Sequence, residues 1–205
     1  MPKVGIININ MGNIASVFNA FQILDFDVEI LESPEEITKV DRLVLPGVGA
    51  FPMAMENLGK AGFLSAIQDF TKAGKPVLGI CLGMQLLFQT GFEFTETSGL
   101  GLIDGTVIPL ASNDVEVRLP HVGWNNVSFI NSKLAAGIPE DSCFYFVHSF
   151  NCEPASEEYV TGITTYGRSF CSVVEKDLTF GVQFHPEKSS AFGLKLLKKF
   201  GELSW

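Results

Sequence analysis

The stretch GICLGMQLLF, residues 79–88, places one cysteine between two glycines and continues at once into an apolar segment. The residues before it, KPVL, are typical of a buried strand. A strand that turns abruptly into a helix forces the corner residue into strained backbone angles, and side chains two positions away would collide with the turn. We therefore predict a strand–helix turn with Cys81 at its corner, flanked by Gly79 and Gly83 where a side chain would not fit.

Upstream of this turn, short apolar runs alternate with segments of helical periodicity. Apolar residues at helical spacing predict helices over residues 14–24 and 63–70. The short apolar runs predict strands over residues 3–8, 27–31, 42–47 and 76–80. Strands that alternate with helices indicate a parallel sheet covered by helices on both faces.

From about residue 100 the pattern changes to a series of strands separated by turn signals. The apolar runs that predict these strands are residues 102–110, 115–119, 124–130, 143–150, 159–166, 168–175 and 178–184. A last helix carries Phe192, Leu196, Phe200 and Leu203 on one stripe. Because no repeat, low-complexity tract or linker divides the chain, we predict a single α/β domain over residues 1–205 with an antiparallel-rich second half.

Charge and hydropathy argue against several classes of protein. The formal net charge is −9 and the longest basic run is the pair Lys198-Lys199, whereas nucleic acid and anionic membranes are bound by clustered Lys and Arg. No apolar run reaches the roughly 18 residues that a membrane span needs, and the start MPKVGIININ has no signal-peptide pattern. We expect a cytoplasmic protein that binds neither nucleic acid nor membranes.

The chain has four cysteines and no CxxC pair, and disulfides are rare in a reducing cytosol. Cys143 and Cys171 lie among apolar residues and are expected to be packed core thiols, while Cys152 is uninformative. Cys81 differs, because a helix N-terminus favours the thiolate of a group whose free pKa is about 8.5. The amide of Leu82 would point to where an oxyanion forms. Cys81 is therefore a candidate nucleophile; the alternative is a small buried side chain between glycines needed for packing.

A thiol nucleophile needs a base and a group that orients the base. Near the C-terminus, His185-Pro186-Glu187 follows a predicted strand. Because proline disfavours helix at the residue before it, this segment is expected to be extended, with the histidine and the glutamate on the same side. If the glutamate accepts from one ring nitrogen, the other nitrogen is free to take the thiol proton. His121 and His148 lack a nearby carboxylate and are expected to be structural or interfacial.

Glycines also follow the strand predicted at residues 42–47. In Pro46-Gly47-Val48-Gly49 they would let backbone amides approach a ligand, or flip, without a side-chain clash. The alternative is an ordinary glycine turn. Asn10-Met11-Gly12-Asn13 can be read as a cap for the first helix. The sequence contains no GxGxxG pattern and no P-loop, and we expect neither a cofactor nor a metal.

Together these motifs resemble those of class I (triad) glutamine amidotransferases over essentially the whole chain. GICLGMQLLF and FHPE are the generic part, and PGVGAF, RLPHVGWN, YFVHSF and FHPEKS are more diagnostic. The resemblance implies a three-layer, flavodoxin-like fold with a mixed central sheet. It also implies that Cys81 attacks the side-chain carboxamide of glutamine, while His185, oriented by Glu187, takes the thiol proton and protonates the departing ammonia. Water would then hydrolyse the glutamyl thioester to glutamate.

The resemblance extends to residues around the substrate. It implies that the amides of Leu82 and Val48 hold the oxyanion and that Gly49 permits the loop to flip. The residues that it places around the amino-acid end of the substrate are Gly47, Gln85, Glu93, Ser149 and Phe150. The alternative for Gln85 is a side chain on the surface of a helix, and the alternative for Glu93 is a solvated carboxylate.

Within the family, the chain is most similar to glutaminase subunits that dock on a (βα)8-barrel synthase and pass ammonia to it through an internal passage. This branch implies a heterodimer whose partner forms imidazole glycerol phosphate and aminoimidazole carboxamide ribotide in histidine biosynthesis. The positions that would face the partner are Asn13, Trp124, Tyr145 and Lys188. A core role is the alternative for each.

Two segments differ from the pattern of this branch. NINMGN stands where an acidic-aromatic pair usually precedes the glycine, and Phe150-Asn151 stands where Tyr-Arg is common. These differences bear on the pathway and the partner contacts, and they leave open a glutaminase subunit that supplies a sugar-amidating synthase of surface polysaccharide biosynthesis. Two further alternatives are a partner-independent cysteine hydrolase on the same scaffold and a non-catalytic binding module.

Overall fold

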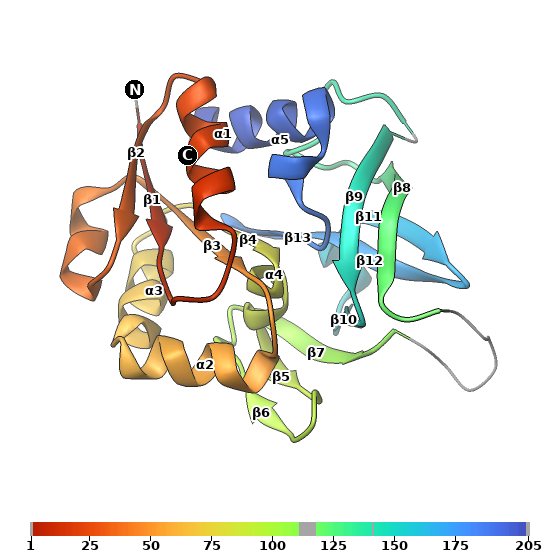
Figure 1. The fold of residues 1–205 in the computed structure, drawn as a ribbon, viewed down its shortest axis with the longest axis horizontal. Coiled ribbons are helices and arrows are strands. Elements are labelled where there is room, and N and C mark those ends of the chain that lie inside the picture. Colours follow the sequence, from red (N-terminus) through yellow and green to blue (C-terminus); the bar gives the residue numbers. More distant parts are fainter. Residues whose placement is uncertain (1, 111–117, 141, 204–205) are drawn as a thin grey trace.

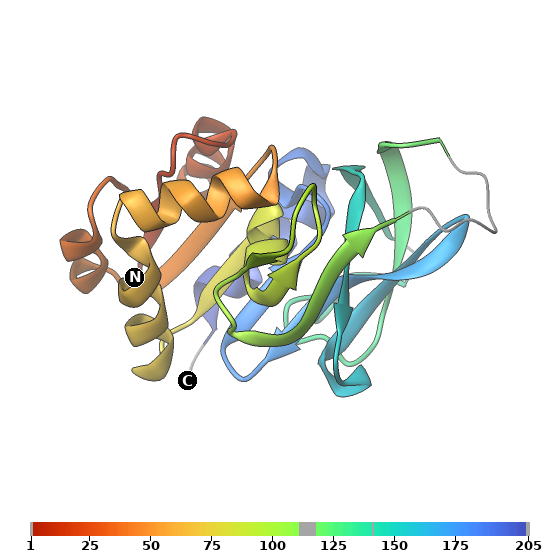
Figure 2. The ribbon, with the colours of Figure 1, turned by 90° about the horizontal axis from the view of Figure 1, so that it is seen from below.

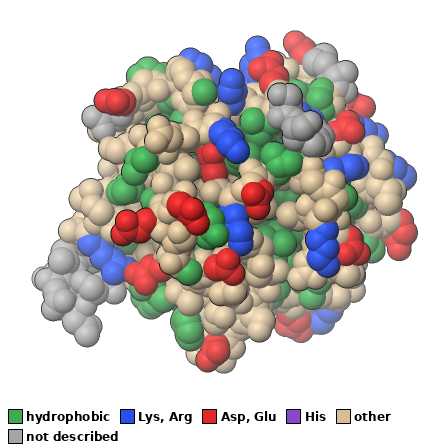
Figure 3. Space-filling model, turned by 180° about the vertical axis from the view of Figure 1, so that it is seen from behind, with side chains coloured by type: hydrophobic (Ala, Val, Ile, Leu, Met, Phe, Trp, Pro, Cys, Tyr) green, Lys and Arg blue, Asp and Glu red, His purple; other side chains and the backbone are tan. Residues whose placement is uncertain are grey.

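The computed structural model describes residues 2–110, 118–140 and 142–203. A long mixed sheet runs through the middle of the molecule, and helices cover its N-terminal part (Figure 1). The strand predicted at residues 115–119 falls largely outside the described residues. On the face shown in Figure 3, Lys and Arg side chains are interspersed with Asp and Glu side chains.

The N-terminal part of the sheet is parallel. Its strands are β1 (Lys3–Ile7), β2 (Asp27–Leu31), β3 (Arg42–Gly47), β4 (Val77–Cys81) and β13 (Thr179–Val182), which pair in the order β2-β1-β3-β4-β13. β3, β4 and β13 are fully buried runs, as expected where helices cover both faces of a parallel sheet. Because these three strands are parallel, their carboxyl ends meet at one edge of the sheet, where ligands bind in open α/β folds.

Two pairs of helices cover opposite faces of the parallel strands. α1 (Ile14–Ile23) and α5 (Ser190–Glu202) bury Phe21 and Phe200 in one core, together with Val44 of β3. α2 (Phe51–Lys60) and α3 (Phe63–Lys72) form the other core, into which β3 turns Leu43 and Leu45. Figures 1 and 2 show α2 and α3 together, away from α1 and α5. The predicted three-layer α/β arrangement is confirmed.

The rest of the sheet is mostly antiparallel. β12 (Arg168–Lys176) pairs antiparallel with β13, and the sheet continues through β10 (Phe150–Pro154) and β7 (Ile103–Pro109). β11 (Val160–Tyr166) links β12 to β8 (His121–Phe129), which forms a two-stranded ribbon with β9 (Ser142–His148). The short elements are α4 (Leu82–Leu86), β5 (Phe88–Gly91), β6 (Thr97–Ser98) and the 3-10 turns η1 (Pro34–Lys39), η2 (Glu157–Tyr159) and η3 (Pro186–Lys188).

Buried Arg42 ties the start of β3 to the end of α5. Its side chain is 1% exposed, its Nε donates to the Phe200 carbonyl at 3.0 Å, and its guanidinium also donates to the Leu203 carbonyl. Burial lowers the pKa of this guanidinium from its usual value of 12.5. Because the last carbonyls of a helix have no partner within the helix, Arg42 supplies donors that the α5 terminus needs.

Some segments differ from the prediction. The strand predicted at residues 143–150 is interrupted at Ser149, which separates β9 from β10, and α2 was not predicted. The helix after Cys81 ends at Leu86, and residues 88–91 form a strand. The end of this helix was not predicted, because a buried apolar run has the same composition in a helix and in a strand.

The prediction that Cys143 is a core thiol was wrong, whereas Cys171 is buried as predicted. In β9 the side chains of Ser142, Phe144 and Phe146 face inward, so Cys143 faces outward and is exposed. Successive strand residues point to opposite faces, and apolar residues stand on both faces of this strand. Local sequence therefore did not show which face was the inner one.

Candidate active site

Cys81 occupies the predicted turn between β4 and α4. Its backbone has φ 55° and ψ −111°, a strained conformation for a residue with a side chain. A Cβ atom at Gly79 would lie 2.5 Å from the carbonyl oxygen of Gly83, and one at Gly83 would lie 1.7 Å from that of Leu45. The glycines on either side of Cys81 are therefore required by backbone contacts, as the sequence predicted.

A cavity of about 300 Å³ opens beside this turn. Its volume is at the lower end of the range for small-molecule sites. Eight residues predicted to act at the site line it together: Val48, Gly49, Cys81, Leu82, Gln85, Glu93, Ser149 and Phe150. Pro120, Val147 and His148 also line the cavity and were not predicted to do so. The topology brings β3, β4 and the β9–β10 junction to this one place.

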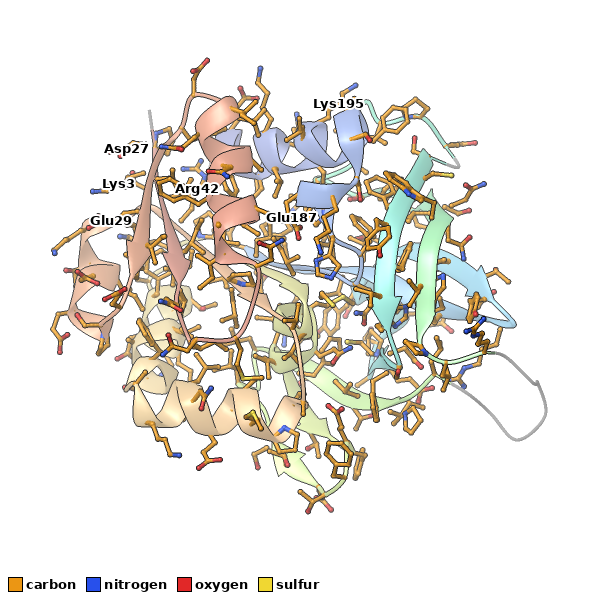
Figure 4. The ribbon with its side chains drawn as sticks, viewed as in Figure 1. Lys3, Asp27, Glu29, Arg42, Glu187 and Lys195 are labelled. Atoms are coloured by element: carbon orange, nitrogen blue, oxygen red, sulfur yellow. The ribbon has the colours of Figure 1, made fainter. Side chains whose placement is uncertain are left out.

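His185 and Glu187 form a buried pair next to the carboxyl end of β4. β13 pairs in parallel with β4, with Val182 opposite Ile80, so the residues after β13 arrive beside Cys81. His185 Nδ1 lies 2.9 Å from Glu187 Oε1, and both side chains are almost fully buried. In Figure 4, Glu187 lies between α1 and the segment that leads into α5.

The predicted juxtaposition of His185 and Glu187 is present, but its geometric reason was wrong. Residues 186–188 form the 3-10 turn η3, and His185 is the extended residue that precedes it. The segment was expected to be extended throughout because Pro186 restricts the residue before it. Proline is also favoured at the first position of a helical turn, and here that preference determines the conformation.

The protonation of His185 depends on both of its neighbours. Burial alone would lower its pKa, but the side chains of Cys81 and Glu187 outweigh burial and raise the pKa from 6.5 to about 10. Nε2 of the ring is buried and, among the described residues, has no hydrogen-bond partner. This nitrogen is therefore available to exchange a proton with Cys81, whose side chain lines the cavity, whereas His185 itself does not line it.

The raised pKa of His185 has a consequence for stability. The folded state holds the proton up to about pH 10, whereas the unfolded chain releases it near pH 6.5. The stabilisation is therefore fully present below pH 6.5 and is lost as the pH rises through 10. It is the reverse of the behaviour of a carboxylate whose pKa is depressed by folding.

We expect Glu187→Gln to lower the pKa of His185 from about 10 toward 6.5. The carboxylate is one of the two groups that raise it, and the neutral amide cannot replace its charge. The glutamine hydrolysis that the resemblance implies should fall by roughly 10²-fold or more, since the imidazole loses its orienting acceptor. NMR titration of the His185 ring in the wild type and the variant measures the shift directly. An unchanged pKa would mean that Glu187 does not govern this histidine.

The loop after β3 lies at the same edge of the sheet. Gly47 is opposite Cys81 in the β3–β4 register, and a Cβ atom there would lie 3.2 Å from Leu82 Cβ. Gly49 has φ +109°, a conformation that favours glycine. Val48 is 41% exposed although it is apolar. Gly47 therefore lets the loop pack closely on the Cys81 turn, and Gly49 provides its left-handed conformation. The proposed flip of the loop and the oxyanion role of the Val48 and Leu82 amides remain predictions.

Gln85 and Glu93 are not ordinary surface side chains. Gln85 is 5% exposed, and its Nε2 donates to the Phe150 carbonyl at 3.2 Å and to Gln183 Oε1 at 3.1 Å. Glu93 Oε2 accepts a hydrogen bond of 2.7 Å from the amide of Phe51, the first residue of α2. Gln183 was not predicted as a site residue; its signal was a polar residue in the run that predicted the buried strand β13, directly after the end of that strand.

Three of the four predicted interface residues lie together outside the cavity. Trp124 is 54% exposed, and its ring meets that of Tyr145 edge to face with centroids 6.1 Å apart. Lys188 Nζ lies 5.8 Å from the centroid of the Tyr145 ring. Asn13 is exposed and caps α1, since its side chain accepts from the amide of Ser16. The core alternative is therefore wrong for Trp124 and Asn13, whose side chains face solvent.

Two properties of the described residues bear on the remaining predictions. Over residues 2–110, 118–140 and 142–203, no group of three or more His, Cys, Asp and Glu side chains is placed to hold a metal ion. In the same part of the chain, every helix is too short or too polar to cross a bilayer.

Comparison with known proteins identifies the family. A sequence profile of the family "Glutamine amidotransferase class-I" matches residues 6–202. The chain therefore belongs to the class I glutamine amidotransferases. The resemblance seen in the sequence is confirmed.

The names of individual relatives describe a narrower group of proteins than the family does. "Imidazole glycerol phosphate synthase subunit HisH" of Moorella thermoacetica is 47% identical over 204 residues, which cover 99% of this chain and 96% of the relative. The protein of the same name from Wolinella succinogenes is 45% identical over 203 residues, covering 98% and 99%. A solved structure described as PurLQS from Thermotoga maritima has a TM-score of 0.76 at 17% identity and covers 97% of each chain. This last likeness supports the fold alone.

Proposed function

We propose that this protein is a glutaminase subunit that hydrolyses glutamine to glutamate and ammonia. With the thiol proton already held by His185, whose pKa is raised to about 10, the Cys81 sulfur attacks the side-chain carboxamide carbon of glutamine, and Glu187 orients the imidazole. The amides of Leu82 and Val48 stabilise the oxyanion. When the C–N bond breaks, His185 returns the proton to the departing ammonia. Water then hydrolyses the glutamyl thioester and regenerates the thiol.

One observation carries this proposal. The strained turn that raises Cys81 above the sheet edge opens on the same cavity as Gln85, Glu93 and the Ser149-Phe150 backbone. A nucleophile is thus placed beside a compact site with both donors and acceptors, which is what a zwitterionic amino acid requires. The buried His185–Glu187 pair next to it supplies the base and the group that orients it.

We propose further that the ammonia passes to a (βα)8-barrel synthase subunit in a cytoplasmic heterodimer. This partner forms imidazole glycerol phosphate and aminoimidazole carboxamide ribotide in histidine biosynthesis, a lyase-type reaction carried out by the other chain. The two named relatives support this pathway, because they are full-length matches at 47% and 45% identity. They favour it over a sugar-amidating synthase. The exposed face formed by Trp124, Tyr145 and Lys188, with Asn13, is the proposed contact, and aromatic residues are enriched at such interfaces.

Reconstitution tests this function. The purified chain should release glutamate slowly by itself and faster with the synthase subunit of a HisH relative and its ribonucleotide substrate, and imidazole glycerol phosphate should form with glutamine as nitrogen donor. A sugar-amidating synthase serves as the control partner and should not stimulate the reaction. Stimulation by that control alone would contradict the pathway, and glutamate release that no partner changes would contradict the subunit role.

A further inference from the structure

Two buried histidines, His121 of β8 and His148 of β9, lie at one end of the β8–β9 ribbon, and His148 lines the cavity. His121 and His148 stand opposite each other in the register of the two strands and are 3% and 6% exposed. The His121 ring is stacked between those of Tyr166 and Phe146, with centroids 4.1 and 4.9 Å away. Buried polar groups are nearly always hydrogen-bonded. The partners of these two rings define where each proton is.

The hydrogen bonds of the pair run in one direction. His148 Nδ1 lies 2.8 Å from the carbonyl oxygen of Phe150, which can only accept, so Nδ1 carries the proton and Nε2 is an acceptor. His121 Nδ1, 2.9 Å from that Nε2, must then be a donor. Nε2 of His121 accepts from Asn125 Nδ2 at 3.3 Å, whose other hydrogen reaches the Thr165 carbonyl at 2.9 Å. Burial lowers the pKa of both histidines to about 4, so both are neutral at pH 7.

The same carbonyl determines the orientation of Gln85. Phe150 O also accepts from Gln85 Nε2, whose second hydrogen goes to Gln183 Oε1. Gln183 Nε2 in turn lies 3.8 Å from the Cys81 sulfur. Both amide hydrogens of Gln85 are thus in use, and only its carbonyl oxygen remains for a ligand in the cavity that it lines. An acceptor there suits the α-ammonium group of an amino acid.

We propose that His121 and His148 are positioning residues for glutamine. They hold the Phe150 carbonyl in place, and that carbonyl holds the Gln85 amide with its oxygen available to the substrate ammonium group. The hydrogen-bond chain from Asn125 through His121 and His148 to the Phe150 carbonyl is a relay. It begins at Asn125, which is the neighbour of the exposed Trp124. The relay therefore also joins the outer ribbon to the substrate pocket. This inference rests on the proposed glutaminase function.

Substitution of His148 separates positioning from general structural support. Leucine removes the donor to Phe150, whereas asparagine keeps an N–H near the position of Nδ1 and is the matched control. In the reconstituted complex, His148→Leu should raise KM for glutamine roughly 10-fold, as expected for one buried hydrogen bond, with kcat within about 3-fold of the wild type. His148→Asn should have a KM close to that of the wild type. Equal KM values for leucine and asparagine variants would overturn the proposal.

The KM for a substrate without the α-ammonium group provides a second test of the positioning role. For glutaramate, which is glutamine without its amino group, KM should change less than about 3-fold in His148→Leu, because the lost contact is one that this substrate cannot make. A general distortion of the pocket would raise KM for both substrates by the same factor, and that outcome would contradict the positioning role.

The wild-type protein tests the relay without any substitution. Long-range ¹⁵N–¹H NMR of the labelled chain at pH 7 should show both rings as neutral Nδ1–H tautomers. An Nε2–H tautomer for His148 would refute the relay, even if the leucine variant fails to fold. Absence of glutamine hydrolysis in the wild-type complex would refute the proposed function instead, and the tautomers would still report on the relay.

Discussion

Replacing Cys81 with alanine should abolish imidazole glycerol phosphate synthesis from glutamine and leave synthesis from ammonium salt unchanged in the reconstituted complex. Alanine fits the turn but has no sulfur to form the thioester, and loss of a nucleophile costs roughly 10³-fold or more. The ammonia-dependent reaction takes place on the partner and needs only that the two chains dock. Steady-state rates with each nitrogen donor measure the two reactions separately.

Cys143→Ser is the matched control for this experiment. Cys143 is an exposed thiol outside the cavity, so its replacement should leave both reactions at the wild-type rate. If Cys81→Ala removes both reactions, the cysteine supports the complex structurally. If glutamate release continues unchanged in Cys81→Ala, the nucleophile is another group. Either result refutes the proposed mechanism.

Gly83→Ala should destabilise the fold more than any other alanine substitution at the site. The added Cβ atom would lie 1.7 Å from the carbonyl oxygen of Leu45, a backbone atom of β3 that cannot rotate away. Relief requires β3 to move away from α4, at a cost of about 3 kcal/mol or more. For a chain of this size, that corresponds to a decrease in Tm of roughly 10 °C. Urea and thermal unfolding of the purified variant measure the loss.

Gly59→Ala provides the control for an added methyl group. Gly59 lies in α2, where a Cβ atom would meet only Leu64 Cδ1 at an ordinary distance of 3.6 Å. Alanine is favoured over glycine in helices by about 1 kcal/mol, so this variant should be as stable as the wild type or more stable. If Gly83→Ala is as stable as Gly59→Ala, the close packing of α4 on β3 is wrong.

The two halves of the chain differed in how well sequence predicted them. Strands β1, β3 and β4 were predicted to within about one residue, because a buried parallel strand between helices is a continuous apolar run. In the second half, many strands are partly buried on both of their faces, and apolar residues occur on both faces. The break at Ser149 and the outward direction of Cys143 could not be recognised there, since pairing with distant strands determines both.

The residues of the site also differ in how well sequence predicted them. The sequence predicted Cys81 as nucleophile from the two glycines, because the backbone clashes that exclude side chains at a strand–helix turn arise within a few residues. It predicted His185 and Glu187 as partners from an extended segment in which residues two apart share a face. The segment is instead the turn η3, and the two side chains still meet because they are close in the chain. His121 and His148 carried no such local signal, and they were expected only to be structural or interfacial.

From the amino-acid sequence alone came the turn that carries Cys81 and the pairing of His185 with Glu187, since each depends on neighbours along the chain. The tertiary structure alone decided that β13 delivers His185 beside β4, and that the β9–β10 junction delivers the Phe150 carbonyl to Gln85. These contacts join segments far apart in sequence. Their geometry depends on the packing of the whole sheet, which no local pattern of residues encodes.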